Sequence, residues 1–244
     1  MSDSRCRGLF ITGTDTGVGK TAVTTALVRL LLKQGRRVGA YKPAASGAED
    51  GPAGPVWSDA ALLAEALAQA FPLERICPQR FLAPLAPPVA AAEEGTQVDS
   101  GLLRTGAEWW ADKVDLLLVE GAGGLLSPIS DTDLVVDLAG DLGFPLLIVA
   151  RLGLGTINHT LLTVEAASRR GVPVAGVILN ETRQAEMVDP ACASNPRELA
   201  RRCPVPILAI VPHCPGADLL PVLESQKIDW SALADSGKHD PSMR

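Results

Sequence analysis

Six short apolar runs, most of them separated by segments of helical character, constrain the fold of this 244-residue chain more than any other feature. Each run is rich in Val, Ile or Leu and lacks alternation of apolar and polar residues, which is typical of strands covered on both faces. Alternation of strands and helices predicts parallel strands joined by right-handed crossovers. The predicted strands are Gly8–Thr12, Val38–Tyr41, Asp115–Glu120, Pro145–Ala150, Val174–Leu179 and Pro206–Val211.

Helical patterns fill three of the intervals between the predicted strands. The predicted helices are Thr21–Gln34, Asp59–Ala70 and Thr156–Arg170. Gly35 and Gly171 follow two of these helices, and glycine is common just after a helix C-terminus. We therefore predict one α/β domain over residues 1–234, with a mostly parallel sheet and helices on both faces, and a frayed polar tail at 235–244.

Two segments rich in small residues or proline are predicted to be surface loops. They are the Gly/Pro/Ala segment Ser46–Trp57 and the Pro-rich segment Pro78–Pro88. In parallel α/β sheets, ligands bind beyond the carboxyl ends of the strands, where loops of this kind line the site.

The composition excludes several classes of protein. The net charge is −6, and no cluster of basic residues is longer than a pair, whereas a nucleic-acid binder normally has a basic face. No apolar run is long enough to span a membrane, and the N-terminus lacks the apolar stretch of a signal peptide. The five cysteines include no C-x-x-C pair, which favours reduced thiols over disulfides or a metal site. We therefore expect a cytoplasmic enzyme that binds neither nucleic acid nor membrane.

A glycine-rich loop between the first predicted strand and the first predicted helix is the strongest local signal. In such a loop, backbone N–H groups and the positive end of the helix converge on phosphate oxygens. Lys20 is expected to reach the β- and γ-phosphates, and the Thr21 hydroxyl to bind Mg²⁺. The loop departs from the G-x-x-x-x-G-K-[ST] pattern because Thr14 occupies its first position. The residues expected to bind the nucleotide are Gly13, Thr14, Asp15, Thr16, Gly17, Val18, Gly19, Lys20 and Thr21.

Charged side chains are also expected near the carboxyl edge of the sheet. Glu120 ends a strand before Gly121–Gly124, where its carboxylate is a natural Mg²⁺ ligand or a cap for the following turn. Lys42 ends another strand beside Pro43, which would stiffen the chain and hold the ammonium group near the phosphate loop; a solvated surface lysine is the alternative. Asp59 is predicted equally well to be a helix N-cap or a site ligand.

Two further polar residues follow predicted strands. The amide of Asn180 could recognise an adenine edge, or Asn180 could belong to a turn. His159 has no cysteine or carboxylate at metal-ligand spacing, which favours a packed or solvent-bonded histidine. The sequence contains no G-x-S-x-G, H-E-x-x-H or Rossmann G-x-G-x-x-G motif, so hydrolase-triad, zinc-protease and dinucleotide-binding functions lack support.

The order of these motifs resembles the dethiobiotin synthetase family from Phe10 to about Asn180. The extra residue in the phosphate loop is a feature of that family, and although relatives share the loop, the ordered set is specific. The matching segments are Thr12–Thr21 (TGTDTGVGKT), Tyr41–Gly47 (YKPAASG), Ser58-Asp59, Pro84–Pro87 (PLAP), Val119–Gly124 (VEGAGG), Gly153–Thr160 (GLGTINHT) and Ile178–Asn180.

The resemblance implies a P-loop NTPase-like fold and a ligase that closes a cyclic urea on 7,8-diaminononanoate. In that reaction one amine takes up CO₂, derived from bicarbonate, as a carbamate. The carbamate oxygen attacks the γ-phosphate of ATP to give a carbamic-phosphoric anhydride. The second amine then closes the ring and expels phosphate. ATP is implied as co-substrate, Mg²⁺ as cofactor, and a homodimer as the assembly.

Particular residues acquire roles through the same resemblance. It implies that Lys20 and Lys42 neutralise the carbamate and the transferring phosphoryl group, while Thr16 helps to position the reacting groups. Asn180 would face the adenine. The implied metal ligands are Thr21, Asp59 and Glu120. The implied substrate-binding residues are Thr16, Ser46, Gly123, Leu154, Gly155, Thr156 and Asn158, with 154–158 reaching the substrate carboxylate across the dimer interface.

Two positions depart from the family pattern. Gly17 replaces a frequent acidic residue, so any contact made there by a carboxylate is missing, and Pro88 stands where many members have His. Amide-forming relatives such as cobyrinate diamide synthase are an alternative, but their chains are usually longer and carry a glutaminase domain. Septum-site and plasmid-partition ATPases are another. These switch proteins typically have a second lysine inside the loop, whereas this loop has none before Lys20.

Overall fold

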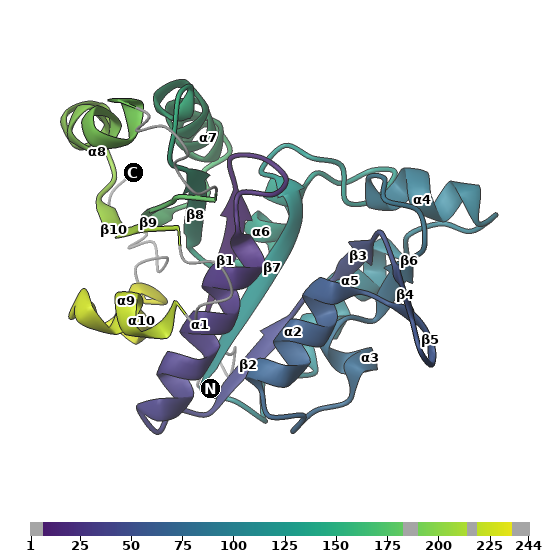
Figure 1. Cartoon of the computed structure of the whole chain (residues 1–244). Coiled ribbons are helices and arrows are strands. Elements are labelled where there is room, and N and C mark those ends of the chain that lie inside the picture. Colours follow the sequence, from purple (N-terminus) through teal and green to yellow (C-terminus); the bar gives the residue numbers. More distant parts are fainter. Residues whose placement is uncertain (1–6, 183–189, 214–218, 236–244) are drawn as a thin grey trace.

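A parallel six-stranded sheet forms the centre of the computed structural model, which describes residues 7–182, 190–213 and 219–235. Its strands are β1 (Arg7–Gly13), β2 (Val38–Tyr41), β7 (Leu116–Gly124), β8 (Leu146–Arg151), β9 (Val174–Asn180) and β10 (Ile207–Val211). They are hydrogen-bonded in the order β10-β9-β8-β1-β7-β2 (Figure 1). All pairs are parallel, so the six predicted strands and the sheet type are confirmed.

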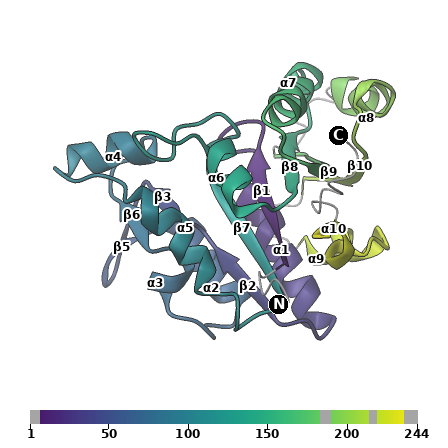
Figure 2. The same cartoon turned by 180° about the vertical axis from the view of Figure 1, so that it is seen from behind.

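Helices cover both faces of this sheet, as predicted. The helices are α1 (Lys20–Lys33), α2 (Ser58–Ala66), α3 (Leu73–Ile76), α4 (Pro87–Glu93), α5 (Ser100–Glu108), α6 (Val135–Leu142), α7 (Thr156–Arg169), α8 (Pro190–Arg202), α9 (Leu220–Ser225) and α10 (Trp230–Leu233). Helix α1 lies over one face and contacts α2, α9 and α10 (Figure 1). Helices α5 and α6 lie over the opposite face (Figure 2) and contact each other.

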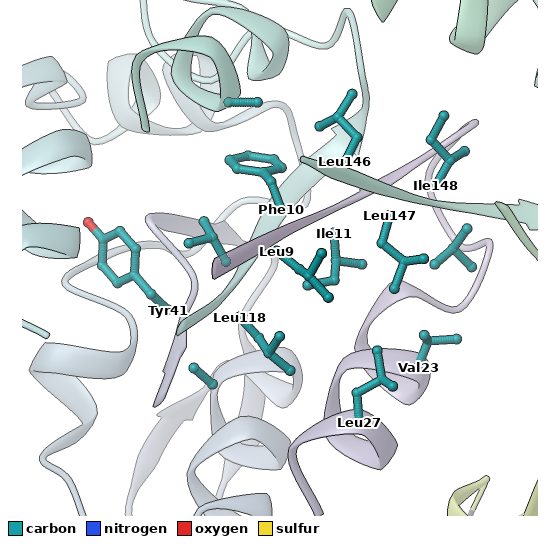
Figure 3. Packing of buried hydrophobic residues seen from close by; sticks show 14 of the residues in the cluster. Leu9, Phe10, Ile11, Val23, Leu27, Tyr41, Leu118, Leu146, Leu147 and Ile148 are labelled. Atoms are coloured by element: carbon teal, nitrogen blue, oxygen red, sulfur yellow. The ribbon is translucent and has the colours of Figure 1, made fainter. Parts of the chain in front are cut away.

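The central strands are buried on both sides. Leu9 and Ile11 of β1 point toward Val23 and Leu27 of α1, whereas Phe10 points to the other side of the sheet (Figure 3). All five side chains are completely buried. Burial on both faces requires apolar residues at consecutive positions, which explains why the strand sequences do not alternate.

Four short strands form two small sheets beside β2, which corrects both loop predictions. They are β3 (Ala44–Ser46) paired with β6 (Gln79–Phe81), and the hairpin strands β4 (Glu49–Gly51) and β5 (Gly54–Val56). The predicted loop Ser46–Trp57 therefore contains a hairpin. The predicted loop Pro78–Pro88 contains β6 and the start of α4, where Pro87 and Pro88 occupy the first turn. Proline suits that position because first-turn N–H groups have no partner within the helix.

Helix α2 is shorter than the predicted Asp59–Ala70. Ala68 and Gln69 adopt left-handed backbone angles, with φ of 52° and 57°, which ends the helical segment despite its alanine-rich sequence. This turn directs Phe71 onto Trp110, with ring centroids 4.7 Å apart in an edge-on arrangement. Packing against the buried Trp110 therefore overrides the local helix propensity.

The described residues include three of the five cysteines. Cys77, Cys192 and Cys203 form no disulfide, and Cys6 and Cys214 lie outside the described residues. No helix in the described ranges is long and apolar enough to cross a bilayer. Asp235, the first residue of the predicted tail, pairs with Arg7, and the rest of that tail lies outside the described residues.

Candidate active site

The phosphate loop joins β1 to α1, which confirms the predicted strand–loop–helix arrangement. Gly19 precedes α1 with a φ of 92°, a left-handed angle that favours glycine. No side chain caps the N-terminus of α1. The N–H groups of its first turn are therefore available to an anion, and the helix dipole favours negative charge there.

Lys20 begins α1 and lies inside the loop that it follows. Its ammonium donates to the carbonyl of Asp15 at 3.3 Å, and its side chain is almost completely buried. Burial lowers the pKa of Lys20 below its ordinary value, and the nearby Lys42 lowers it further. An anionic phosphate beside these two cations would offset both effects.

Four side chains from separate elements meet next to this loop. The Lys42 ammonium, at the end of β2, lies 2.5 Å from Asp59 Oδ2 and 2.7 Å from Glu120 Oε1. The Thr21 hydroxyl lies 2.8 Å from Asp59 Oδ1 and 2.8 Å from Glu120 Oε1. Lys42, Thr21 and Glu120 are thus brought together, although β7 continues to Gly124 and does not end at Glu120 as predicted. The N-cap alternative for Asp59 is wrong, because Trp57 occupies the N-cap of α2 and Asp59 lies in its first turn.

The oxygen atoms in this cluster fit a magnesium ion. The Thr21 hydroxyl has one proton, so it can donate to only one of the two carboxylates at a time. Glu120 is completely buried, and its Oε2 has no hydrogen-bond partner among the residues that the structure describes. Two carboxylates and one hydroxyl beside a phosphate loop match the preference of Mg²⁺ for hard oxygen ligands completed by phosphate and water. Thr21, Asp59 and Glu120 are therefore suitable metal ligands.

Charge pairing controls the ionisation of the cluster. Burial favours the neutral form of Lys42, but the carboxylates of Glu120 and Asp59 outweigh burial and raise its pKa above the ordinary value. Burial also opposes the charged form of Asp59, yet Lys42 lowers the pKa of this carboxyl below its usual range. Lys42 and Asp59 are consequently both charged at neutral pH, which suits the stabilisation of an anionic reacting group.

A cavity of about 800 Å³ opens in front of Lys20 and Lys42. Thr16, Ser46 and Gly123, all predicted to contact substrate, line it. The remaining lining residues are Gly17, Gly19, Thr21, Ala44, Ala45, Asp59, Pro84, Leu85, Ala86, Pro87, Ala122, Ser127 and Pro128. A cavity of this size is typical of small-molecule sites.

The segment after β8 does not line this cavity. Leu154 is 86% exposed, and Gly155 and Asn158 are also exposed. The buried Thr156 hydroxyl instead lies 3.4 Å from that of Thr160 within α7. Leu154, Gly155 and Asn158 are therefore presented at the surface, and neither they nor the buried Thr156 line the cavity of their own chain.

Asn180 supports the phosphate loop from the end of β9. Its side-chain amide donates to the carbonyl of Val18 at 2.9 Å and is buried. Asn180 is the last residue of β9, so its place in the sheet fixes the loop. Contact with adenine remains a prediction. His159 is exposed at the start of α7, in accord with the solvent-bonded interpretation.

Sequence reasoning missed several residues of the cavity wall. Ser127 lies beside Gly123, and its hydroxyl accepts a hydrogen bond from the N–H of Gly124 at 2.9 Å. Leu85 approaches from the other side, where its carbonyl accepts from Ser46 Oγ at 2.6 Å. No motif marks Ser127, whereas the Pro84–Pro87 match was a usable signal. Of the two departures, Gly17 lines the cavity and Pro88 is buried within α4.

The substitution Gly19→Ala is expected to weaken ATP binding by about tenfold or more. A Cβ atom at Gly19 would lie 2.1 Å from Asn180 Nδ2, in addition to the cost of its left-handed backbone. Gly17→Ala is the matched control, because Gly17 also has a positive φ, of 69°, but no atom lies within 4 Å of its Cβ position. Calorimetric titration with ATP should show the larger loss for Gly19→Ala. Equal losses would mean that the contact with Asn180 is unimportant.

Comparison with known proteins identifies the family of this chain. A family model described as an AAA domain matches residues 7–218. The ATP-dependent dethiobiotin synthetase BioD of Anaeromyxobacter dehalogenans (strain 2CP-C) is 48% identical over 209 residues, covering 86% of this chain and 91% of that protein. The protein of the same name from Rhodopirellula baltica is 45% identical over 213 residues, covering 83% and 82% respectively. The one from Thermodesulfovibrio yellowstonii is 41% identical over 235 residues, covering 93% and 94%.

Solved structures show the same fold at greater distance. The MinC:MinD cell division complex of Aquifex aeolicus matches with a TM-score of 0.53 and 18% identity, covering 95% of this chain and 94% of that chain. The septum site-determining protein MinD of Pyrococcus horikoshii matches with a TM-score of 0.52 and 20% identity, covering 95% and 93%. These likenesses show a P-loop NTPase-like fold alone. The extensive sequence identity establishes that the chain belongs to the ATP-dependent dethiobiotin synthetase family.

Proposed function

We propose that this ligase closes the cyclic urea of dethiobiotin from 7,8-diaminononanoate, CO₂ and ATP, and releases ADP and phosphate. The observation that carries the proposal is that Lys42, Thr21, Asp59 and Glu120 contact one another beside a cavity that Lys20 and Lys42 also line. The reaction passes through a carbamate and a transferring phosphoryl group, both anionic. Positive groups held in place by carboxylates can stabilise such charge without reorganising.

Each chemical step has a group suited to it. The carbamate forms when an amine nitrogen bonds to the carbon of CO₂ and loses a proton. A carbamate oxygen then bonds to the γ-phosphorus as the bond to ADP breaks, and Lys20 and Lys42 stabilise the negative charge. The second amine attacks the carbamate carbon, loses a proton and expels phosphate. Thr16 and Ser46, which line the cavity, keep the reactants aligned, and such alignment contributes much of the rate.

Mg²⁺ belongs to this proposal as the cofactor and ATP as the co-substrate. Thr21, Asp59 and Glu120 would hold the ion directly or through water. The ion supplies charge neutralisation at the phosphate oxygens of ATP. The partnerless Oε2 of the buried Glu120 supports this assignment, since a buried carboxylate oxygen without a partner is costly unless a ligand completes it.

The distal end of the substrate is assigned to a second copy of the chain. The segment 154–158, with Leu154 86% exposed, would bind the substrate carboxylate at the cavity of the partner in a homodimer. Exposure of a large apolar side chain supports contact with another molecule. The proposal also includes a cytoplasmic site of action, where ATP and bicarbonate are supplied.

Isotope labelling tests the proposed reaction. With ¹³C-bicarbonate, ATP, Mg²⁺ and the diamine, the expected product is a cyclic urea whose mass includes a single ¹³C atom. Omission of ATP should remove the product. A labelled carbamate without ring closure, or no incorporation, would contradict the proposal.

A further inference from the structure

The residues suited to hold Mg²⁺ are also the ion-pair partners of Lys42. Asp59 directs Oδ1 to Thr21 and Oδ2 to Lys42, so both of its oxygens are engaged. Glu120 Oε1 lies within hydrogen-bond distance of both the Thr21 hydroxyl and the Lys42 ammonium. A cation that binds these carboxylates must therefore share or displace the contacts of the Lys42 ammonium.

The charges of the cluster reinforce this competition. Lys42 is 3% exposed, Lys20 is 7% exposed and Glu120 is completely buried. The Asp59 side chain, by contrast, is 47% exposed. The two positive charges of Lys20 and Lys42 balance the two negative charges of the Asp59 and Glu120 carboxylates. A free divalent cation would consequently bring two uncompensated positive charges next to the buried Glu120 carboxylate, where screening by water is reduced. A cation that arrives with nucleotide phosphates brings the compensating negative charge with it.

We propose that Lys42 is a placeholder cation, which excludes free divalent metal from the Asp59–Glu120 site and admits metal only together with nucleotide. This inference rests on the proposed Mg²⁺–ATP site. With a nucleotide-bound ion held by Asp59 and Glu120, the ammonium of Lys42 would turn toward the cavity that Lys42 already lines.

The test is a titration of nucleotide-free protein with Mn²⁺ as the probe ion. Binding is monitored by the paramagnetic resonance signal of free Mn²⁺. Wild type is expected to bind Mn²⁺ weakly. Lys42→Met is expected to bind it about tenfold more tightly or better, a gain of about 1.4 kcal/mol, because the competing charge is gone. Lys42→Arg keeps the charge and should stay as weak as wild type. Lys33→Met is the control, since Lys33 is exposed and pairs with Glu224 at 2.8 Å.

Further variants and measurements decide each outcome. Glu120→Gln introduced into Lys42→Met should remove the gain and so locate the ion at this site. If Lys42→Met does not fold, Lys42→Gln takes its place. The wild-type titration is also a test by itself, because tight binding of Mn²⁺ to nucleotide-free wild type would overturn the proposal. Lys42→Met binding no tighter than wild type would also overturn it. Formation of the cyclic urea by wild type is scored separately, so a failed placeholder role cannot be confused with a failed function.

Discussion

Lys42→Ala is expected to reduce turnover by about a thousandfold while ATP binding stays close to wild type. Lys42 lines the cavity beside the phosphate loop, and its ammonium is held by Asp59 and Glu120 at 2.5 and 2.7 Å. Removing one preorganised charge from a developing anion typically costs a factor of about 10²–10³ in rate. The loop residues proposed to bind the nucleotide are unchanged. Single-turnover kinetics and calorimetric ATP titration measure the two quantities.

The same substitution should also lower stability, and this effect must be separated from catalysis. It leaves the completely buried Glu120 without its cationic partner, which commonly costs about 3–5 kcal/mol of unfolding free energy. Turnover should therefore be measured well below the midpoint of thermal unfolding of each variant. Lys33→Ala, at an exposed lysine, controls for the loss of a surface ion pair. Undiminished turnover in Lys42→Ala would remove Lys42 from the mechanism.

Glu120→Gln is expected to raise the Mg²⁺ concentration for half-maximal activity by about 10–100-fold. Changes to groups that merely support a ligand already cost about that much in metal affinity, and here a charged ligand itself would be lost. The amide keeps the size and shape of the side chain, so the fold should persist. Activity is titrated with Mg²⁺ at saturating ATP. Glu108→Gln, at the exposed end of α5, provides the matched control. An unchanged Mg²⁺ titration would mean that Glu120 only shapes the turn after β7.

The central sheet could be predicted from the sequence because both of its faces are buried. Consecutive residues such as Phe10 and Ile11 are therefore both apolar. Prediction from the sequence failed where the local pattern was weak or misleading. The hairpin Glu49–Val56 is exposed along most of its length and has no apolar alternation to reveal its strands. The end of α2 was missed because the left-handed Ala68 and Gln69 are set by packing of the residues that follow.

Part of the site could be predicted for a topological reason. Lys42 and the phosphate loop follow parallel strands, Glu120 lies within another, and the carboxyl ends of such strands share one edge of the sheet. Asp59 lies on α2, after a hairpin, so no strand order determines its position. Its partners Lys42 and Thr21 are 17 and 38 residues away in the chain and became visible only in three dimensions. The bond from Asn180 to Val18 spans 162 residues and was likewise beyond any local pattern.

Phosphate release from ATP, measured with Mg²⁺ and bicarbonate in the presence and absence of 7,8-diaminononanoate, tests the central claim most directly. For the proposed reaction, phosphate release is expected to depend on the diamine, and one cyclic urea should form for each phosphate released. Hydrolysis at the same rate without the diamine, or no release with it, would contradict the account. Such a result would favour a switch ATPase or an enzyme that acts on another substrate.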